Sequence, residues 1–355
     1  MSSLRPTITG KNAELIKNPE TLENHVKTDT LTIKNKTVNG ADFDDRNLQN
    51  ILISNSTLIQ YWHRNGSLLN SSFENVDFDV GSFTKSTLTN VTFENADLTD
   101  IGFIGTTFID VTFKNCKFQG NKFLGIKGKV TFIDSDLDSV DFHEAQAAIT
   151  LINSKVHNTF NPRLQTFTNQ QVGASIDMTD TTLYDLQIGG TLTHVKARGG
   201  AITKVGIGDN IKEVVFDNVR LEMSMGGVVD TLIIRDSLSN RMGIGEMKIN
   251  NLIIEDCQPT FSLSLTDGQY NAISIDNCNM ESFKPWSITA NQLHISDSTF
   301  QNTIMSDSKI NHLTLKNVTF ENGKFDNAMA KETNITGVKL GGGEFNMAGS
   351  NIPLQ

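Results

Sequence analysis

Five acidic side chains lie within eleven residues of each other, with no lysine or arginine between them. They are Asp134, Asp136, Asp138, Asp141 and Glu144. Alternating aspartates of this kind could bind Ca²⁺ through their carboxylate oxygens or imitate the phosphates of a nucleic acid. A run of like charges is more often an ordinary solvated edge. The stretch is therefore an acidic patch whose binding role stays open.

The remaining residues hold no pattern typical of catalysis. No glycine-rich phosphate loop leads from a strand pattern into a helix, and residues 206–208, although glycine-rich, lack that context. The seven histidines are scattered, no Cys/His spacing fits a zinc site, and no Ser-His-Asp set emerges from spacing. We therefore expect a protein that is not an enzyme and that binds no metal or cofactor.

Composition narrows the classes of function. The formal net charge is −10, which disfavours direct binding to nucleic acid or to an anionic membrane. No apolar run is long enough for a membrane span, and residues 1–10 lack the apolar region of a secretory signal. Three cysteines suit a reducing compartment. We expect synthesis in the cytoplasm, and export by a signal-independent route into a host cell stays open.

The aromatic residues are mostly phenylalanine: 21 Phe against 2 Trp and 3 Tyr. A surface that stacks sugar rings or nucleobases usually uses Trp and Tyr, which combine an apolar face with a polar edge. Phe has no polar group and is typical of a core. The bias therefore indicates packing inside the protein.

A five-residue period positions these phenylalanines. From Phe43 to Phe123, every fifth residue is Phe, Leu or Ile, and His63 is the single exception among seventeen positions. This period is neither that of an α-helix nor that of a flat strand, so the chain must turn a corner every five residues. We expect a four-sided coil, with the large residue directed to the axis, a smaller one two positions before it, and polar residues facing water.

This pattern resembles the pentapeptide-repeat family, whose consensus is Ala-(Asp/Asn)-Leu-X-X. Residues 41–45 (ADFDD) and 96–100 (ADLTD) carry the resemblance. The resemblance implies an all-β fold, namely a right-handed parallel β-helix. The corner residues, counted along the sequence, indicate about sixteen coils. Each coil also carries Asn or Asp at one corner, as at residues 35, 55, 75, 95 and 115, where short polar side chains suit a tight turn and can hydrogen-bond from coil to coil.

The period also sets the domain organisation. Regular pentapeptide blocks cover residues 41–125 and 293–347, and irregular coils of the same solenoid cover residues 126–292. We expect one solenoid over residues 30–355, preceded by an N-terminal cap at residues 1–29. Asn18 and Pro19 form a helix-start signal, which predicts a short capping helix over about residues 19–27.

Two departures from the repeat are candidate binding sites for a protein partner. Tyr61, Trp62, His63 and Arg64 place bulk and charge where small and apolar residues belong, which indicates either an exposed anchor or a bulge whose rings cover a gap. Between Asn153 and Asp180 the corner spacing widens. The surplus residues predict a loop at a corner of the coil, which includes Pro162, Arg163 and Phe167. This loop either binds a partner or is an insertion that the fold tolerates.

These observations favour a non-enzymatic scaffold that binds a protein partner of unknown identity. The proteins that this chain resembles include bacterial effectors with a β-helical binding part. Pairing of two copies of the chain through a solenoid end also stays open. An alternative is a DNA-mimicking inhibitor of a type II topoisomerase such as gyrase. Duplex DNA carries about three charges per coil rise, whereas this chain averages well under one per coil. A β-helix enzyme acting on acidic polysaccharide is less consistent with the diffuse lysines and arginines.

Overall fold

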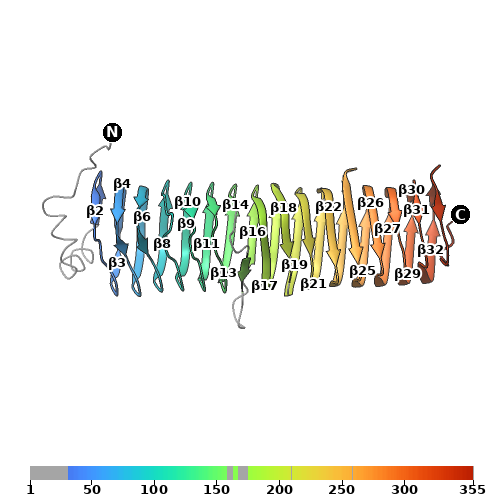
Figure 1. Cartoon of the computed structure of the whole chain (residues 1–355), viewed down its shortest axis with the longest axis horizontal. Coiled ribbons are helices and arrows are strands. Elements are labelled where there is room, and N and C mark those ends of the chain that lie inside the picture. Colours follow the sequence, from blue (N-terminus) through green and yellow to red (C-terminus); the bar gives the residue numbers. More distant parts are fainter. Residues whose placement is uncertain (1–30, 158–162, 167–174, 209, 258, 355) are drawn as a thin grey trace. The chain divides into compact units, whose positions relative to one another are not determined.

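The computed structural model describes residues 31–157, 163–166, 175–208, 210–257 and 259–354. Within these ranges the regular secondary structure consists of β-strands alone. The chain divides into two compact units, Met1–Leu186 and Gln187–Gln355. The described residues of each unit form a parallel β-solenoid, with about 15 turns in all, close to the expected sixteen (Figure 1). The expected capping helix at residues 19–27 lies outside the described residues, and a single solenoid domain over residues 30–355 stays a prediction.

The strands of the first unit are mostly short. They are β1 (Leu31–Lys34), β2 (Thr37–Asn39), β3 (Asn47–Gln49), β4 (Ile51–Ile59), β5 (Tyr61–Trp62), β6 (Ser67–Phe78), β7 (Gly81–Ser82), β8 (Thr87–Glu94), β9 (Thr107–Lys114), β10 (Lys117–Gln119), β11 (Lys127–Ile133), β12 (Asp136–Asp138), β13 (Gln146–Ile152), β14 (Lys155–His157), β15 (Arg163–Thr166) and β16 (Ser175–Thr179). Strand β17 (Thr182–Arg198) carries the chain into the second unit.

The strands of the second unit are longer until the last coils. They are β18 (Ala201–Ile207), β19 (Asn210–Asp217), β20 (Arg220–Met225), β21 (Val228–Arg235), β22 (Leu238–Gly245), β23 (Lys248–Glu255), β24 (Phe261–Thr266), β25 (Gln269–Asp276), β26 (Asn279–Trp286), β27 (Thr289–Ser296), β28 (Thr299–Ile304), β29 (Lys309–Lys316), β30 (Thr319–Phe320), β31 (Gly323–Lys324), β32 (Met329–Thr336), β33 (Lys339–Leu340) and β34 (Phe345–Asn346).

Strands pair in parallel with the strand one coil later, and the register keeps like residues in contact. In the pairing of β6 with β8, Leu68 lies opposite Leu88, and Phe73 lies opposite Phe93. A coil of twenty residues is four pentapeptides, so each position of the repeat returns to the same place on the next coil. The five-residue grid predicted from the sequence is therefore the inward-facing set of side chains.

Phenylalanine rings form two columns inside the first unit. Residues 73, 93, 113 and 132 stack in one column, and residues 83, 103, 123 and 142 stack in the other, with centroids 4.8–5.4 Å apart. Rings of different columns meet edge to face, as Phe93 and Phe83 do at 5.6 Å. Offset stacking and edge-to-face contact are both favourable for aromatic rings. All of these rings are fully or almost fully buried, so the predicted Phe core is confirmed.

The corners of the first unit explain both the period and the asparagines. A positive φ recurs every fifth residue over much of residues 35–125, as at Asn70 (49°) and Asn75 (52°). Asn and Asp tolerate this left-handed conformation better than other residues except Gly. The side-chain amide of Asn75 donates to Asn55 at 2.9 Å, and that of Asn95 donates to Asn75 at 2.9 Å. The expected coil-to-coil asparagine ladder is confirmed.

The corners are farther apart in most of the second unit. From Glu246 to Asn327 the non-glycine residues with positive φ follow one another at intervals of ten or eleven. Each coil there has two such corners, and the faces between them are single strands of six to eight residues in β23 to β29. This spacing extends into the block at residues 293–347 as far as Asn327, and inward positions there such as Phe300 and Phe320 are buried at the predicted five-residue steps.

Candidate binding surfaces

Tyr61 is part of the core, so the expectation that it projects from the coil is wrong. Its side chain is only 1% exposed. Its ring lies 5.4–6.1 Å from four phenylalanine rings, those of residues 43, 73, 78 and 83. Tyr61 points inward from the position two residues before the main grid, which Ala41 and Gly81 occupy in the coils on either side.

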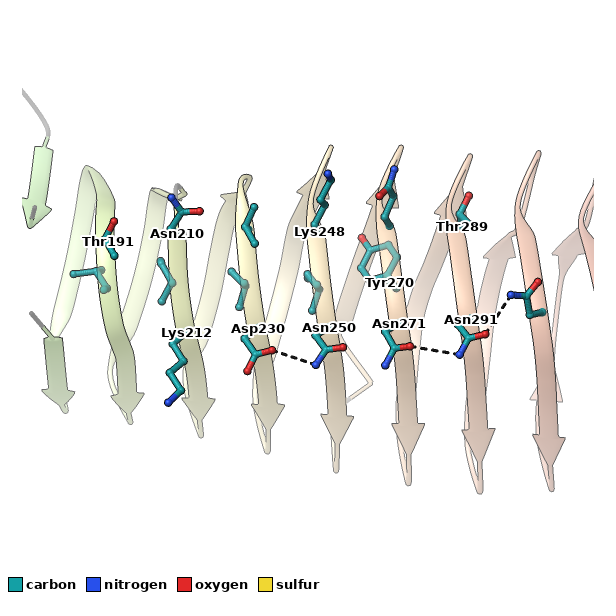
Figure 2. A pocket seen from close by; sticks show the side chains of 17 residues that line it. Thr191, Asn210, Lys212, Asp230, Lys248, Asn250, Tyr270, Asn271, Thr289 and Asn291 are labelled. Carbon is teal, nitrogen blue, oxygen red and sulfur yellow. Dashed lines mark hydrogen bonds between the residues drawn. The ribbon is translucent and has the colours of Figure 1, made fainter. Parts of the chain in front are cut away.

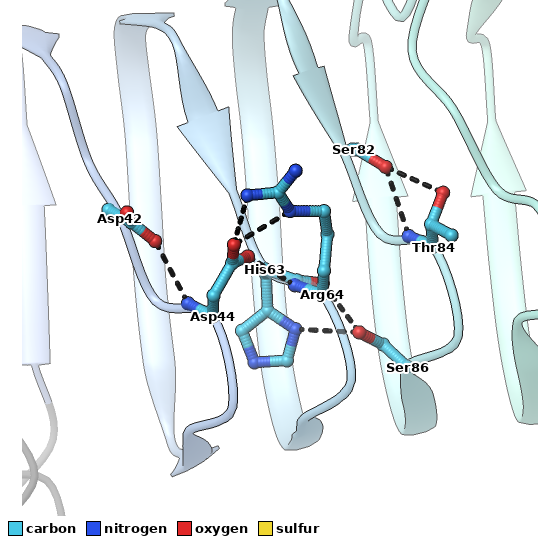
Figure 3. A network of polar contacts seen from close by, with 7 residues as sticks. All are labelled: Asp42, Asp44, His63, Arg64, Ser82, Thr84 and Ser86. Atoms are coloured by element: carbon cyan, nitrogen blue, oxygen red, sulfur yellow. Dashed lines mark hydrogen bonds and ion pairs between the residues drawn. The ribbon is translucent and has the colours of Figure 1, made fainter.

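His63 is also buried, at 0% exposure, and this part of the expected anchor is wrong too. Its Nδ1 lies 3.3 Å from Ser86 Oγ, whose hydroxyl donates to the His63 carbonyl (Figure 3). Ser86 Oγ therefore accepts a hydrogen bond from the Nδ1–H of His63, and Nε2 is left buried without a hydrogen-bond partner among the described residues. Burial lowers the pKa of His63 to about 4, so the ring is neutral at neutral pH.

Trp62 and Arg64 remain on the surface, half-buried and exposed respectively. The Arg64 Nε donates to Asp44 Oδ2 at 2.7 Å, and its backbone N–H donates to Asp44 Oδ1 at 2.8 Å (Figure 3). The guanidinium lies 5.0 Å from the centre of the Trp62 ring, a cation–π distance. Partial burial opposes ionisation of Asp44, but the hydrogen bonds from Arg64 outweigh it and lower the pKa of that carboxyl.

The predicted corner loop is described only in part. Pro162 and Phe167 lie outside the described residues, and Arg163 is the first residue of β15. A role of these residues in partner binding stays a prediction.

The acidic stretch does not gather on one face of its coil. Asp134 and Glu144 are corner residues with positive φ. Asp136 and Asp138 belong to β12, and Asp141 lies beyond the next corner, where its carboxylate accepts the His143 N–H at 2.9 Å. His157 of β14 lies 2.6 Å from Asp136 Oδ1. In the described part of the chain, no group of three or more His, Cys, Asp or Glu residues is placed to hold a metal ion.

A groove of about 790 Å³ runs across one face of the second unit (Figure 2). It crosses β17, β19, β21, β23, β25, β27 and β29, all on the same side of successive coils. Its two rims are outward-facing rows on these strands, and the buried positions between the rows form its floor. The first row contains Thr191, Asn210, Val228, Lys248, Gln269 and Thr289; the second contains Lys212, Asp230, Asn250, Asn271, Asn291 and Asn311.

The second row is a ladder of side-chain amides. Asn311 donates to Asn291 at 3.2 Å, and Asn291 donates to Asn271 at 3.4 Å. Asn250 donates to Asp230 at 3.1 Å (Figure 2). An amide has two donor hydrogens and two acceptor lone pairs, so one bond to each neighbour leaves donors and acceptors for a ligand. The groove was not predicted, although asparagine at residues 250, 271, 291 and 311 repeats at nearly the coil length.

Trp286 lies on another face of the second unit, at the end of β26, and is 54% exposed. Lys284 and Trp286 both point outward because Phe283 and Pro285 alternate with them and are buried. Phe283 pairs with Thr303, so Lys284 lies beside Ile304 of the next coil. We call Lys284, Trp286, Ile304 and Lys324 the Trp286 surface; Ile304 pairs with Lys324. In the sequence, side chains of a strand alternate between the core and the surface. Counting from Phe283 as a core residue could therefore have identified Trp286 as exposed.

Comparison with known proteins agrees with this geometry. A family model described as pentapeptide repeats matches residues 82–120 with eight copies. The matched repeats and the parallel β-solenoid together identify a pentapeptide-repeat protein. No curated protein matches the sequence. Among the described residues, no helix is long and apolar enough to cross a membrane.

Proposed function

We propose that this repeat scaffold is a non-enzymatic protein that binds a protein partner through the Trp286 surface. The observation that carries the proposal is the exposure of Trp286, which pairs with Ser306 of the next coil, with Ile304, itself 37% exposed, two residues before Ser306. Tryptophan is among the residues most enriched at the energetic centres of protein interfaces. Two lysines flank Ile304, at residues 284 and 324, and supply a polar border of the kind that surrounds such centres.

The fold supports this role by holding the surface rigid. The strands under the Trp286 surface pair with the coils on both sides: β26 pairs with β24 and with β28. The backbone hydrogen bonds of β26 are thus largely formed before any partner arrives. Little conformational entropy remains to be lost there on binding, which favours affinity.

Trp62 and Arg64 form a second, smaller candidate surface on the first unit. Arg64 already has its guanidinium bound to Asp44 and packed over Trp62. A partner carboxylate would have to compete with Asp44 for Arg64, which weakens this surface as an anchor. We therefore rank it second to the Trp286 surface.

We further propose that the partner is a host protein and that the chain acts as a delivered bacterial effector. The support is the resemblance to effectors with β-helical binding parts, together with a surface suited to protein contacts. The alternative of a DNA-mimicking gyrase inhibitor has less support, because such a mimic needs carboxylates aligned along one face. The acidic stretch at residues 134–144 instead turns around several sides of its coil.

Affinity capture tests the proposal. Wild-type protein and the Trp286→Ala variant are immobilised and exposed to bacterial and to host-cell lysates. We expect at least one protein to be retained by wild type and by a Trp62→Ala control, and to be lost from Trp286→Ala. Equal capture by wild type and Trp286→Ala would contradict the proposal. Inhibition of gyrase supercoiling by the wild type would favour the alternative.

A further inference from the structure

The groove on the second unit forms a positive strip in an acidic protein. Lys212 and Lys248 line it, and Lys309 extends the row of Thr289 by one coil. None of these three lysines forms an ion pair with another described residue. Asp230 is the one acidic residue among the described residues that line the groove, and it accepts a hydrogen bond from Asn250. Since the chain carries a net charge of −10, three unpaired cations on one face favour an anionic ligand there.

The groove also sets a repeat length for its ligand. Successive coils are about 4.8 Å apart, so the six steps from β17 to β29 cover roughly 29 Å. The amides of residues 250, 271, 291 and 311 return at this step, one for each coil. A ligand whose own repeat matches the step can place the same polar group against every coil.

An extended acidic peptide does not match this step. Its side chains return to one face after two residues, a rise of about 6.7 Å. The mismatch is about 2 Å per coil, so a peptide that is aligned with one asparagine would be out of register within two or three coils.

A nucleic acid strand does not match the charge density. Such a strand carries one charge about every 3.4 Å, whereas Lys212, Lys248 and Lys309 are two to three coils apart, roughly 10–14 Å. Single-stranded nucleic acid is also usually bound through exposed aromatic rings. Tyr270, the aromatic residue among those described along the groove, is buried.

We propose that this groove binds a linear anionic polysaccharide of equatorially linked pyranose sugars. Such a chain advances by nearly one coil step per sugar ring, so each ring would lie over one coil. Ring hydroxyls both donate and accept hydrogen bonds, as the ladder amides do. With a carboxylate on every second sugar, one carboxylate would meet Lys212 and the next would meet Lys248, two coils away. This inference concerns a different surface from the Trp286 surface and does not depend on the proposed function.

Affinity should rise with the number of sugars, because each further sugar adds hydrogen bonds or a charge contact to one more coil. No aromatic ring would stack on the ligand. The test is calorimetric titration at low salt with hyaluronan oligosaccharides, in which glucuronate alternates with N-acetylglucosamine. We expect the octasaccharide to bind at least tenfold more tightly than the tetrasaccharide. A neutral β-1,4-glucan oligosaccharide of the same length should bind more weakly than the hyaluronan octasaccharide, and raised salt should weaken hyaluronan binding.

Two groove variants and one matched control locate the site. Lys248→Gln and Asn271→Ala should each weaken octasaccharide binding by about tenfold or less, in line with loss of one charged or neutral hydrogen bond. Lys316→Gln, an exposed lysine outside the groove, should leave binding unchanged. Thermal melting establishes that all three fold. The proposal is overturned if the octasaccharide does not bind, if polyglutamate or single-stranded DNA binds as tightly, or if both groove variants match the wild type.

Discussion

Tyr61 lies opposite Gly81 in the pairing of β5 with β7, and the missing side chain of Gly81 lets the two backbones approach closely. A Cβ atom on Gly81 would lie 2.4 Å from the Tyr61 carbonyl oxygen and 3.4 Å from the side chain of Ile101. The close approach at Gly81 therefore concerns the backbone of residue 61, while the Tyr61 ring packs among the phenylalanine rings. The departure from the repeat at residues 61–64 is thus largely a packing feature of the core.

Tyr61→Ala should destabilise the protein strongly. Removing a buried aromatic ring typically costs about 3–5 kcal/mol of unfolding free energy, because the cavity is only partly refilled. Trp62→Ala, one residue on and half-buried, should cost about 1 kcal/mol or less. Urea unfolding followed by circular dichroism measures both. Similar losses in the two variants would show that Tyr61 is not the core residue of the pair.

Adjacent residues of β9 test the inward and outward directions of the coil. Phe108 is 0% exposed, whereas Ile109 is 44% exposed. Phe108→Asp would bury a carboxylate among stacked rings and should prevent soluble folding. Ile109→Asp should express and melt like the wild type. Recovery of both variants as soluble, equally stable protein would contradict the assignment of the five-residue grid to the core.

The pentapeptide grid made most of the fold predictable, because a strict spacing and a buried residue type agree at nearly every position. The sequence did not reveal that Tyr61 and His63 point inward, since bulk and polarity alone suggested exposure. The clue was the register: His63 stands on the five-residue grid between Phe43 and Phe83, and Tyr61 stands two positions before it, at the inward position that Ala41 and Gly81 occupy one coil away. The Trp286 surface and the groove were missed for another reason. They form from residues of several coils on both sides of residue 293, whose register becomes clear only when corners ten residues apart replace those five apart.

His63 should make stability depend on pH. Its pKa is about 4 in the folded protein, against about 6.5 when unfolded. Between these values the unfolded chain binds more protons, so the free energy of unfolding falls as the pH drops from about 6.5 to about 4. The full difference corresponds to roughly 3 kcal/mol, of which a large part should be lost by pH 5.

The matched variant for this prediction is His63→Leu, which restores the residue type of the repeat. Urea midpoints are compared at neutral pH and at pH 5 for both proteins. The wild type should lose distinctly more stability than His63→Leu. The same acid-induced loss in both would assign the effect to other groups.

Asn75 tests the role of the left-handed corners. Its φ is 52°, and its side chain bonds to Asn55 and Asn95. Asn75→Ala loses both amide bonds and keeps a Cβ atom in the left-handed conformation, which costs about 1–2 kcal/mol relative to glycine. Asn75→Gly loses the same bonds without that cost. We therefore expect Asn75→Gly to be more stable than Asn75→Ala by about 1 kcal/mol in urea unfolding, and the reverse order would contradict this explanation of the corner residues.

The most direct test of the scaffold account is the dissociation constant of the captured partner for wild type and for Trp286→Ala. The account predicts a loss of affinity of about thirtyfold, the scale of an interface centre worth 2 kcal/mol, with an unchanged urea midpoint because Trp286 is exposed. Ile109→Asp, which alters an exposed residue of the first unit, serves as the control and should bind like the wild type. An unchanged dissociation constant for Trp286→Ala would contradict the account.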